Sequence, residues 1–472
     1  MMSNRDNDLI DLREIAPAEV GEIDLYQRRE RIYTRKVEGF FQKVRLYTGW
    51  PLLLGYFLLP WLSWNGQQSV LFDLPERKFH ILGLTFWPQD FPMLAFLLII
   101  SAYTLFTVTT FAGRIWCGYS CPQTVWTTMF MWVEQATEGS RNQRIKLDRA
   151  AISLEKLRKK CLKHAGWLVI AFMTGLTFVG YFYGIQDLLR DLLTLKATDW
   201  GLFWVTFFTV ATYINAGYMR EQVCKYMCPY ARFQAVMFDQ DTLIVSYDNN
   251  RGDPRGSRKK TADPRELGLG SCIDCELCVQ VCPTGIDIRD GLQYECIGCA
   301  LCIDACDSVM DKMKYPRGLV RYTSEHELSG GRTHWLRPRI IGYAVMLCLM
   351  IGVFSYTMYS RIPLELTVIR DRNQLYVTTD TGAVDNIYTL QLVNMDHDSH
   401  VFRISLEGLG QARIIGEIEH KLNGGEVRSI SLRLRANPNE LDKPSTEFDF
   451  KAQATDMDSL NIVHESRFVK PL

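Results

Sequence analysis

The sequence predicts a polytopic α-helical membrane protein with five spans, a cysteine-rich insert before the last span and a C-terminal immunoglobulin-like β-sandwich. Three observations predict this architecture. Five apolar stretches contain no Asp, Glu, Lys or Arg, and their length matches the roughly 20 residues that cross a bilayer core as a helix. Twelve of the 14 cysteines fall in four tight groups. From residue 361 onward, short runs alternate between apolar and polar residues.

The five expected spans are residues 47–64, 91–112, 166–185, 201–219 and 340–359. Buried helices of a large soluble protein are the alternative, but five uncharged stretches of this length rarely coincide in one globular fold. Basic and acidic residues are equal in number, 53 each. This balance argues against a nucleic-acid-binding protein, which normally carries a basic excess.

Basic residues concentrate on one side of the expected membrane. They are frequent before the first span, after the second and after the fourth, and sparse in loops 65–90 and 186–200. Because Lys and Arg favour the cytoplasmic side, the sequence predicts a bacterial inner-membrane protein with a cytoplasmic N-terminus. That N-terminal segment lacks the apolar region of a signal peptide. The expected order is a charged segment 1–46, four helices in 47–219, a cytoplasmic segment 220–339, a fifth helix in 340–360 and a periplasmic domain 361–472.

Eight cysteines of the cytoplasmic segment, within about residues 264–315, repeat the spacing C-x2-C-x2-C-x3-C. This spacing is typical of bacterial ferredoxins with two [4Fe–4S] clusters, in which the fourth cysteine of each copy ligates the other cluster. Zinc sites instead set two C-x2-C pairs more than about ten residues apart. The sequence therefore predicts one cluster on Cys272, Cys275, Cys278 and Cys306, and a second on Cys296, Cys299, Cys302 and Cys282.

A second motif, C-x-Y-x-C-P, occurs at residues 117–122 and again at 224–229. Each copy follows an expected span and precedes an amphipathic stretch, so both are expected at the cytoplasmic membrane face. Cysteines at i and i+4 share one face of a helix, and the proline should end or bend that helix. Two such pairs on adjacent helices would present four sulfurs to one site, contributed by Cys117, Cys121, Cys224 and Cys228.

These four motif cysteines are predicted to be a redox or metal site. Soft thiolates suit Cu(I) or a further iron–sulfur centre better than magnesium or calcium, and a reducing compartment disfavours a static disulfide. The sequence does not separate stable metal binding from reversible dithiol chemistry. The remaining alternative is that these cysteines only pack in the interior of a membrane protein. The other two cysteines are single, and Cys348 in the fifth span is expected to be a small core residue.

The alternating runs of residues 361–472 predict a β-sandwich, and the absence of cysteine means that no disulfide holds it. His397 and His400 form this domain's close histidine pair. Two histidines alone make a weak copper or zinc site, so a solvated turn is favoured there. The domain is expected to contact a partner rather than to carry out chemistry.

Together, the two cysteine motifs in duplicate, the five spans and the terminal β-sandwich resemble the FixG/CcoG (RdxA) family of bacterial cytochrome c oxidase accessory proteins, along essentially the whole chain. The membrane half alone also resembles NapH-type quinol dehydrogenase subunits. The FixG/CcoG resemblance implies a role in assembly of the cbb3-type oxidase. It also implies reduction of Cu(II) to Cu(I) in the cytoplasm, for copper chaperones and a copper-exporting ATPase.

The resulting hypothesis is a cupric reductase in which electrons pass through both clusters to copper held by Cys117, Cys121, Cys224 and Cys228. Its expected partners are membrane lipid, an unidentified cytoplasmic electron donor, the copper chaperone or ATPase, and oxidase assembly factors. A homodimer is compatible with the sequence, and no nucleic acid is expected. The alternatives are a membrane quinol oxidoreductase, with quinone bound among the spans, and a non-enzymatic assembly scaffold.

Overall fold

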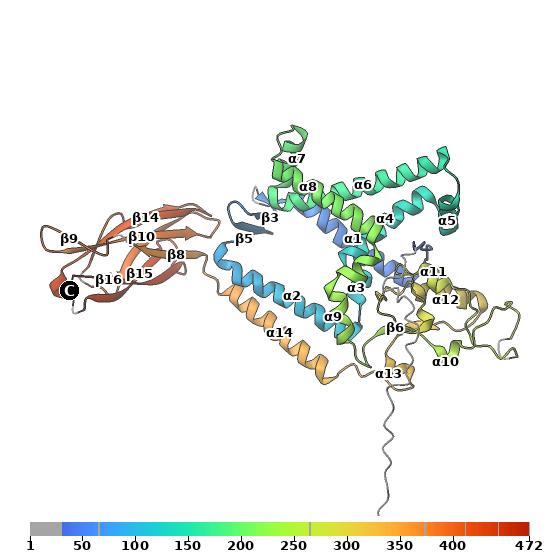
Figure 1. Cartoon of the computed structure of the whole chain (residues 1–472). Helices are drawn as coiled ribbons and strands as arrows, with labels where there is room; N and C mark the ends of the chain where they lie inside the picture. Colours follow the sequence, from blue (N-terminus) through green and yellow to red (C-terminus); the bar gives the residue numbers. More distant parts are fainter. Residues whose placement is uncertain are drawn as a thin grey trace, which may run out of the picture.

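The computed structural model describes residues 31–64, 67–263, 266–371, 374–410, 412–441 and 443–471. Most of the expected N-terminal segment 1–46 therefore lies outside the described residues. A helical body occupies the middle of the molecule, with the cysteine-rich insert at one end and a β-sandwich at the other (Figure 1). This arrangement separates the two domains along the length of the helices.

Among the described residues, three helices are long and apolar enough to cross a membrane: Pro88–Ala112, Leu154–Tyr183 and Pro338–Tyr359. They correspond to the second, third and fifth expected spans and mark the chain as a membrane protein. The first expected span falls on α1 (Phe40–Leu58), which begins in the charged segment. The fourth falls on α8 (Asp199–Thr212), which continues as the π-helix η3 (Tyr213–Met219). Five spans thus stay a prediction.

Two of the long helices, α2 (Phe91–Ala112) and α14 (Pro338–Tyr359), lie side by side in antiparallel orientation (Figure 1). Phe96 packs against Phe354 and Tyr103 against Tyr343, with ring centroids 6.3 and 5.6 Å apart. Most other apolar side chains of the pair face outward. An apolar surface of this size needs lipid or protein to cover it. Cys348 belongs to this exposed surface of α14, so its prediction as a core residue is wrong.

Three further helices of the body pack against α6 (Leu154–Tyr183), namely α4 (Pro122–Glu138), α7 (Ile185–Leu193) and α8. The short helices α3 (Ile115–Tyr119) and α9 (Pro229–Met237) pack against α2, and α5 (Arg141–Arg149) packs against α4. The proline of each C-x-Y-x-C-P motif is the first residue of a new helix, Pro122 of α4 and Pro229 of α9. Proline is favoured at that position because the backbone N–H it lacks would have no helical partner. The predicted helix break at both motifs is confirmed.

The cysteine-rich insert is closed by a two-stranded antiparallel sheet. Strand β6 (Ile244–Tyr247) pairs with β7 (Val320–Thr323), so the two ends of the insert meet. Between them lie α10 (Asn249–Gly252), α11 (Leu277–Val281), the 3-10 turn η5 (Ile288–Asp290) and α12 (Leu301–Met313), and α13 (Glu325–Leu328) follows β7. Valine, isoleucine and leucine side chains from these elements form the core around the cysteines.

The C-terminal domain is a sandwich of two antiparallel sheets, as its alternating pattern predicts. One sheet contains β8 (Leu364–Arg370), β9 (Val377–Thr378), β10 (Val384–Asn394), β12 (Arg413–Ile415) and β14 (Val427–Ala436). The other contains β11 (His400–Glu407), β13 (Glu419–Leu422), β15 (Ser445–Ala454) and β16 (Asn461–Val469). Their inner faces bury a single apolar core that includes Tyr388, Phe402 and Phe450.

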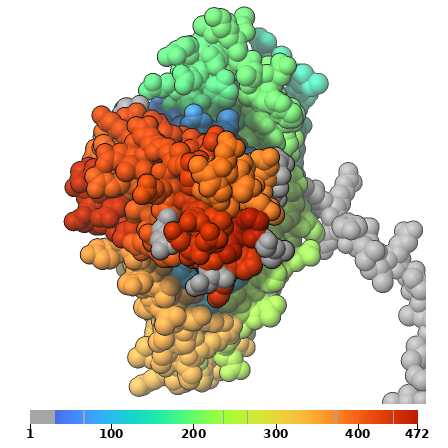
Figure 2. All heavy atoms as spheres, turned by 90° about the vertical axis from the view of Figure 1, so that its left-hand side faces the viewer, coloured from blue at the N-terminus to red at the C-terminus, as the bar shows by residue number. Residues whose placement is uncertain are grey.

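The sandwich contacts the end of the helical body next to the start of α2. Short strands precede α2 there: β1 (Ser63–Trp64), β2 (Gln67–Gln68), β3 (Val70–Asp73), β4 (Lys78–Ile81) and β5 (Leu84–Phe86). Trp87 is buried against Val393 and Met395 of the sandwich, and Arg361 forms a 2.6 Å ion pair with Asp90. Seen from this end, the sandwich stands in front of the helical body (Figure 2).

The histidine pair of the sandwich is held by hydrogen bonds. His397 Nε2 lies 2.7 Å from the carbonyl oxygen of Gly83. His400 is buried, with Nδ1 2.7 Å from Asp456 and Nε2 3.3 Å from Asp396. Burial alone would lower the pKa of His400, but the two carboxylates outweigh it and raise that pKa above 6.5.

His400 should make the stability of the sandwich depend on pH. A raised pKa in the folded state contributes stability that is complete below the unfolded-state pKa and is lost as pH rises through the folded-state pKa. We expect the urea midpoint of the sandwich, followed by proteolysis of the full chain, to fall as the pH rises above about 6.5, the ordinary pKa of histidine. His400→Asn should remove this fall, whereas His464→Asn, at a half-buried position of the same domain, should retain it. Identical pH profiles for His400→Asn and the wild type would contradict the assignment.

Candidate metal and redox centre

The two ferredoxin-like cysteine loops have the same backbone conformation. In the first loop, Asp274 and Glu276 have φ values of 53° and 55°, and in the second Gly298 and Ala300 have 64° and 59°. These left-handed residues occupy equivalent places in the two loops, on either side of the second cysteine. Successive backbone N–H groups in such loops form a concavity that binds anionic centres, including iron–sulfur clusters.

The cysteines predicted for the first cluster gather around α11 and α12. The thiol of Cys306, in α12, lies close enough to Cys278, Cys272 and Cys275 to interact electrostatically with all three. Those predicted for the second cluster line one cavity, which holds Cys282, Cys296, Cys299 and Cys302 together with Cys278. The structure thus brings together the members of each predicted set, in an interior otherwise lined by Val, Ile, Ala and Thr.

The donor set fits two iron–sulfur clusters. All eight cysteines are free thiols, and burial raises the pKa of Cys278, Cys296 and Cys306 to about 12. Buried thiols with such a pKa would stay protonated at neutral pH unless a cation compensated the thiolate charge. Iron would provide that compensation, and the backbone N–H groups of Gly298 and Leu301 donate to the sulfurs of Cys296 and Cys299.

The four motif cysteines lie close to one another. The thiol of Cys117 interacts electrostatically with Cys121 and Cys224, and that of Cys121 interacts with Cys228. Burial raises the pKa of Cys117 to about 12 and that of Cys224 to about 11. The sequence-predicted site is therefore assembled from two chain segments that lie about a hundred residues apart in the sequence.

Local structure around the motif cysteines partly offsets this burial. Cys121 and Cys228 directly precede α4 and α9. At the N-terminus of α4, the partial positive charge favours the thiolate of Cys121. Backbone N–H groups of Gln123 and Thr124 donate to Cys121. The amide oxygen of Gln234 accepts a hydrogen bond from Cys117 at 3.4 Å.

The first motif packs directly on the second cluster loop. A Cβ added to Gly118 would lie 2.8 Å from Cys299 Cα and 2.9 Å from the carbonyl oxygen of Ile297. Arg45 Nε donates to the carbonyl oxygen of Gly118 at 3.0 Å, and Arg114 donates to that of Cys296 at 3.3 Å. The two cysteine centres are thus neighbours with little protein between them.

A buried carboxylate joins the second motif to the helix that follows the first. Glu134 of α4 is 1% exposed and forms ion pairs with Arg144 at 3.0 Å and with Arg220 at 2.8 Å. The carbonyl oxygen of Arg220, four residues before Cys224, also accepts a hydrogen bond from Gln123 at 3.1 Å. Breaking one member of such a buried set leaves an uncompensated charge, which is strongly destabilising.

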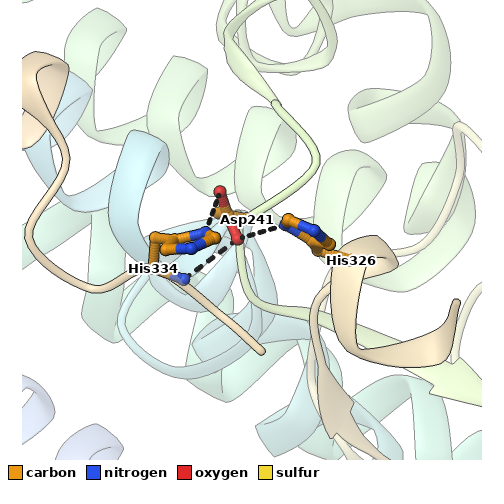
Figure 3. A group of neighbouring side chains, drawn as sticks. All are labelled: Asp241, His326 and His334. Atoms are coloured by element: carbon orange, nitrogen blue, oxygen red, sulfur yellow. Dashed lines mark hydrogen bonds and ion pairs between the residues drawn. The ribbon is translucent and has the colours of Figure 1, made fainter. Parts of the chain in front are cut away.

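Sequence reasoning missed one cluster of metal-binding side chains. Asp241, His326 and His334 bring their ligand atoms within 4.8 Å of one another (Figure 3). The two histidines are eight residues apart, but the aspartate precedes His326 by 85 residues, so no local motif announces the group. The short spacing between the two histidines is the sequence feature that could have indicated this metal-binding group.

Comparison with known families identifies three segments of the chain. Residues 219–325 match the model of a 4Fe-4S dicluster domain, and residues 94–136 match that of a 4Fe-4S binding domain. Residues 354–471 match the IG-like fold at the C-terminus of FixG. The match at residues 219–325 contains the eight ferredoxin-like cysteines and the second C-x-Y-x-C-P motif. The match at residues 94–136 contains the first C-x-Y-x-C-P motif.

Curated relatives match along most of the chain. The chain is 39% identical to the nitrogen fixation protein FixG of Rhizobium meliloti over 83% of its own length and 82% of the relative's. It is 42% identical to protein RdxA of Cereibacter sphaeroides, over 81% and 84% of the two chains. A crystal structure of a FixG-related protein from Vibrio parahaemolyticus covers 23% of this chain and 98% of its own, at 32% identity and a TM-score of 0.22.

Gly118→Ala should loosen the junction between the motif and the cluster loop. The added methyl group meets backbone atoms of Cys299 at 2.8 Å, and such overpacking typically costs about 1–3 kcal/mol. We expect cluster absorbance to bleach at a lower temperature under anaerobic heating. Gly55→Ala in α1, where a Cβ would meet nothing within 4 Å, is the control and should bleach like the wild type. Equal bleaching temperatures for Gly118→Ala and the wild type would show that the junction is not tight.

Proposed function

The chain belongs to the FixG/RdxA family, and on that premise we propose that it reduces Cu(II) to Cu(I) for assembly of a cbb3-type cytochrome c oxidase. It is an iron–sulfur membrane protein by its family matches and long apolar helices. The charge distribution of the loops supports a cytoplasmic position for both cysteine centres, in a bacterial inner membrane. The β-sandwich would then face the periplasm and contact assembly partners.

The observation that carries the proposal is the direct packing of the first motif, which contributes two of the four neighbouring thiols, on a cluster loop. Gly118 lies between Cys117 and Cys121 and touches the backbone of Cys299. A one-electron donor and a soft-metal site are therefore adjacent. When bound, the two [4Fe–4S] clusters supply single electrons, and Cu(II) needs one electron to become Cu(I).

The residues of the chain contribute ligands, charge and shielding to this reaction. The motif thiolates favour Cu(I) over Cu(II), since soft sulfur ligands select the monovalent ion. At the N-terminus of α4, the backbone N–H groups of Gln123 and Thr124 partly offset the burial that raises the pKa of Cys121. Arg114 lies near Cys117 and Cys224, and its positive charge favours their thiolate forms. Copper would be passed on from this site to a chaperone or an exporting ATPase.

Replacing Cys117, Cys121, Cys224 and Cys228 by Ser should abolish copper reduction while leaving the ferredoxin-like clusters in place. The eight ferredoxin-like cysteines are unchanged in this variant, so cluster absorbance should stay. The measurement is an anaerobic mixing of the dithionite-reduced protein, freed of excess dithionite, with Cu(II), followed by cluster absorbance and a Cu(I)-specific chelator. A double Ser variant of Cys161 and Cys348, which lie outside both centres, is the control. Wild-type rates in the four-Ser variant would refute the assignment of the copper site.

A quinol oxidoreductase is the second candidate, and one cavity favours it. This cavity of about 480 Å³ is lined by Trp167, His164 and Tyr218, and its wall includes Pro283, the residue after Cys282. An aromatic, polar cavity next to a predicted cluster ligand suits a redox-active ring. Reduced clusters that ignore Cu(II) but are reoxidised by a soluble quinone would favour this function over copper reduction.

Iron content separates a copper site from a third cluster at the motif cysteines. The 4Fe-4S match at residues 94–136 favours the cluster, whereas our proposal expects about eight iron atoms per chain, four for each of two clusters. Anaerobic iron and sulfide analysis of the wild type and of the four-Ser variant should give the same value. A loss of about four iron atoms in the variant would instead assign the motif cysteines to a third cluster.

A further inference from the structure

Asp241, His326 and His334 form a small group on the insert, between the end of α9 and the start of α14 (Figure 3). Asp241 Oδ1 lies 3.3 Å from His326 Nδ1, and Asp241 Oδ2 lies 3.5 Å from His334 Nδ1. Both distances exceed the 2.7–2.9 Å of a charge-assisted N–H···O hydrogen bond. The carboxylate of Asp241 lies between the two imidazole rings, and all three side chains bring their ligand atoms within 4.8 Å of one another (Figure 3).

The spacing of the ligand atoms suits one metal ion. Nitrogen and oxygen ligands about 2.0–2.1 Å from one ion, at square-planar or tetrahedral angles, lie about 2.9–3.4 Å from each other. The side chain of Asp241 is 17% exposed, that of His326 38% and that of His334 65%. Three protein ligands with an open, solvent-facing side are typical of a site that keeps a position for water or substrate, rather than of a closed structural site.

Separate contacts hold each ligand in place. The backbone N–H of His326 donates to the carbonyl oxygen of Gln240 at 3.0 Å, and that of His334 donates to Asp241 Oδ1 at 3.0 Å. A Cβ at Gly331 would lie 2.5 Å from Cδ2 of His326, so glycine leaves room for this ring. The neighbouring Asp239 pairs with Arg337, which keeps that positive charge compensated. The group is thus organised without an ion.

We propose that Asp241, His326 and His334 bind Cu(II) from solution. Imidazole and carboxylate ligands bind first-row divalent ions, and among these Cu(II) binds most tightly to a given set of nitrogen and oxygen donors. The site contains no sulfur, so it has no preference for the monovalent ion. It is distinct from the thiol site and has the opposite ligand chemistry.

We assign this site a role as the entry point for Cu(II), and this role rests on the proposed function. Leu243, two residues after Asp241, lines a cavity together with Cys296 of the second cluster set. Helix α9 has nine residues, about 13 Å in length, and joins Cys228 at its start to the Asp241 loop beyond its end. Cu(II) takes up one electron from an iron–sulfur centre and becomes Cu(I), and this step makes or breaks no covalent bond. The Cu(I) then exchanges its nitrogen and oxygen ligands for the motif thiolates, which it prefers.

Binding is tested by electron paramagnetic resonance of Cu(II) added to the full-length protein in detergent. The four-Ser background is used, with the clusters oxidised, so that motif thiolates neither bind nor reduce the ion. We expect one tightly bound Cu(II) whose signal shows splitting by imidazole nitrogen. Adding His326→Asn and His334→Asn should weaken binding by about tenfold or more, because two of three ligands are lost. His464→Asn in the same background should bind like its parent.

Unchanged Cu(II) affinity and nitrogen splitting in the double histidine variant would overturn the proposed site. Circular dichroism and cluster absorbance identify a variant that has failed to fold. Should the double variant fail to fold, His334→Asn alone replaces it, since this side chain is 65% exposed. The single variant is then expected to lose part of the nitrogen splitting, and full splitting would overturn the site.

The role in reduction has its own measurement, made with all motif cysteines present. The double histidine variant should raise the KM for Cu(II) by about tenfold or more while kcat at saturating Cu(II) stays near wild type. An unchanged KM would overturn the entry role. A wild-type protein that binds Cu(II) at this site but never reduces it would contradict the proposed function and leave the metal site standing.

Discussion

The close contact between the backbones of Gly118 and Cys299 is the constraint on which both cysteine centres depend. No side chain separates the first C-x-Y-x-C-P motif from the second cluster loop at this point. Arg45 and Arg114 hold the carbonyl oxygens of Gly118 and Cys296. Their positive charges also act against the burial that raises the thiol pKa of Cys299 and Cys296. The same two side chains therefore fix the spacing of the centres and favour thiolate.

Features encoded locally could be predicted from the sequence. Cysteine spacing predicted the two groups around Cys306 and Cys302, because a loop that wraps a cluster needs ligands with only two or three residues between them. The helix starts at Pro122 and Pro229 follow from the backbone of proline alone. The alternation of apolar and polar residues predicted the sandwich, because successive side chains of a strand point to opposite faces and only one face is buried in the core. Each of these signals spans fewer than about a dozen residues.

Features that depend on distant contacts were not predictable. Asp241 meets His326 only because β6 and β7 pair and close the insert, and Glu134 meets Arg220 only through packing of α4 against η3. The first and fourth apolar stretches show the same limit. Composition predicted a span in each, whereas in the structure α1 begins at Phe40, within the charged segment, and α8 changes to π-helix at Tyr213. The β-sandwich contact of His397 with Gly83 is likewise non-local.

Two sites of opposite ligand type next to one electron-transfer centre would give copper movement a direction. Before reduction, the nitrogen and oxygen donors of the Asp241 group compete well for Cu(II). After the proposed reduction, the ion would be softer, and its free energy of binding would shift toward the sulfur of Cys117, Cys121, Cys224 and Cys228. The difference in copper affinity between the two sites would change sign with the oxidation state of the ion. Reduction alone would therefore make the transfer of copper favourable, without a conformational change of the protein. The rigid contacts at Gly118, Gly331 and Glu134 are consistent with such a mechanism, because they preserve both ligand sets while the ion alone changes.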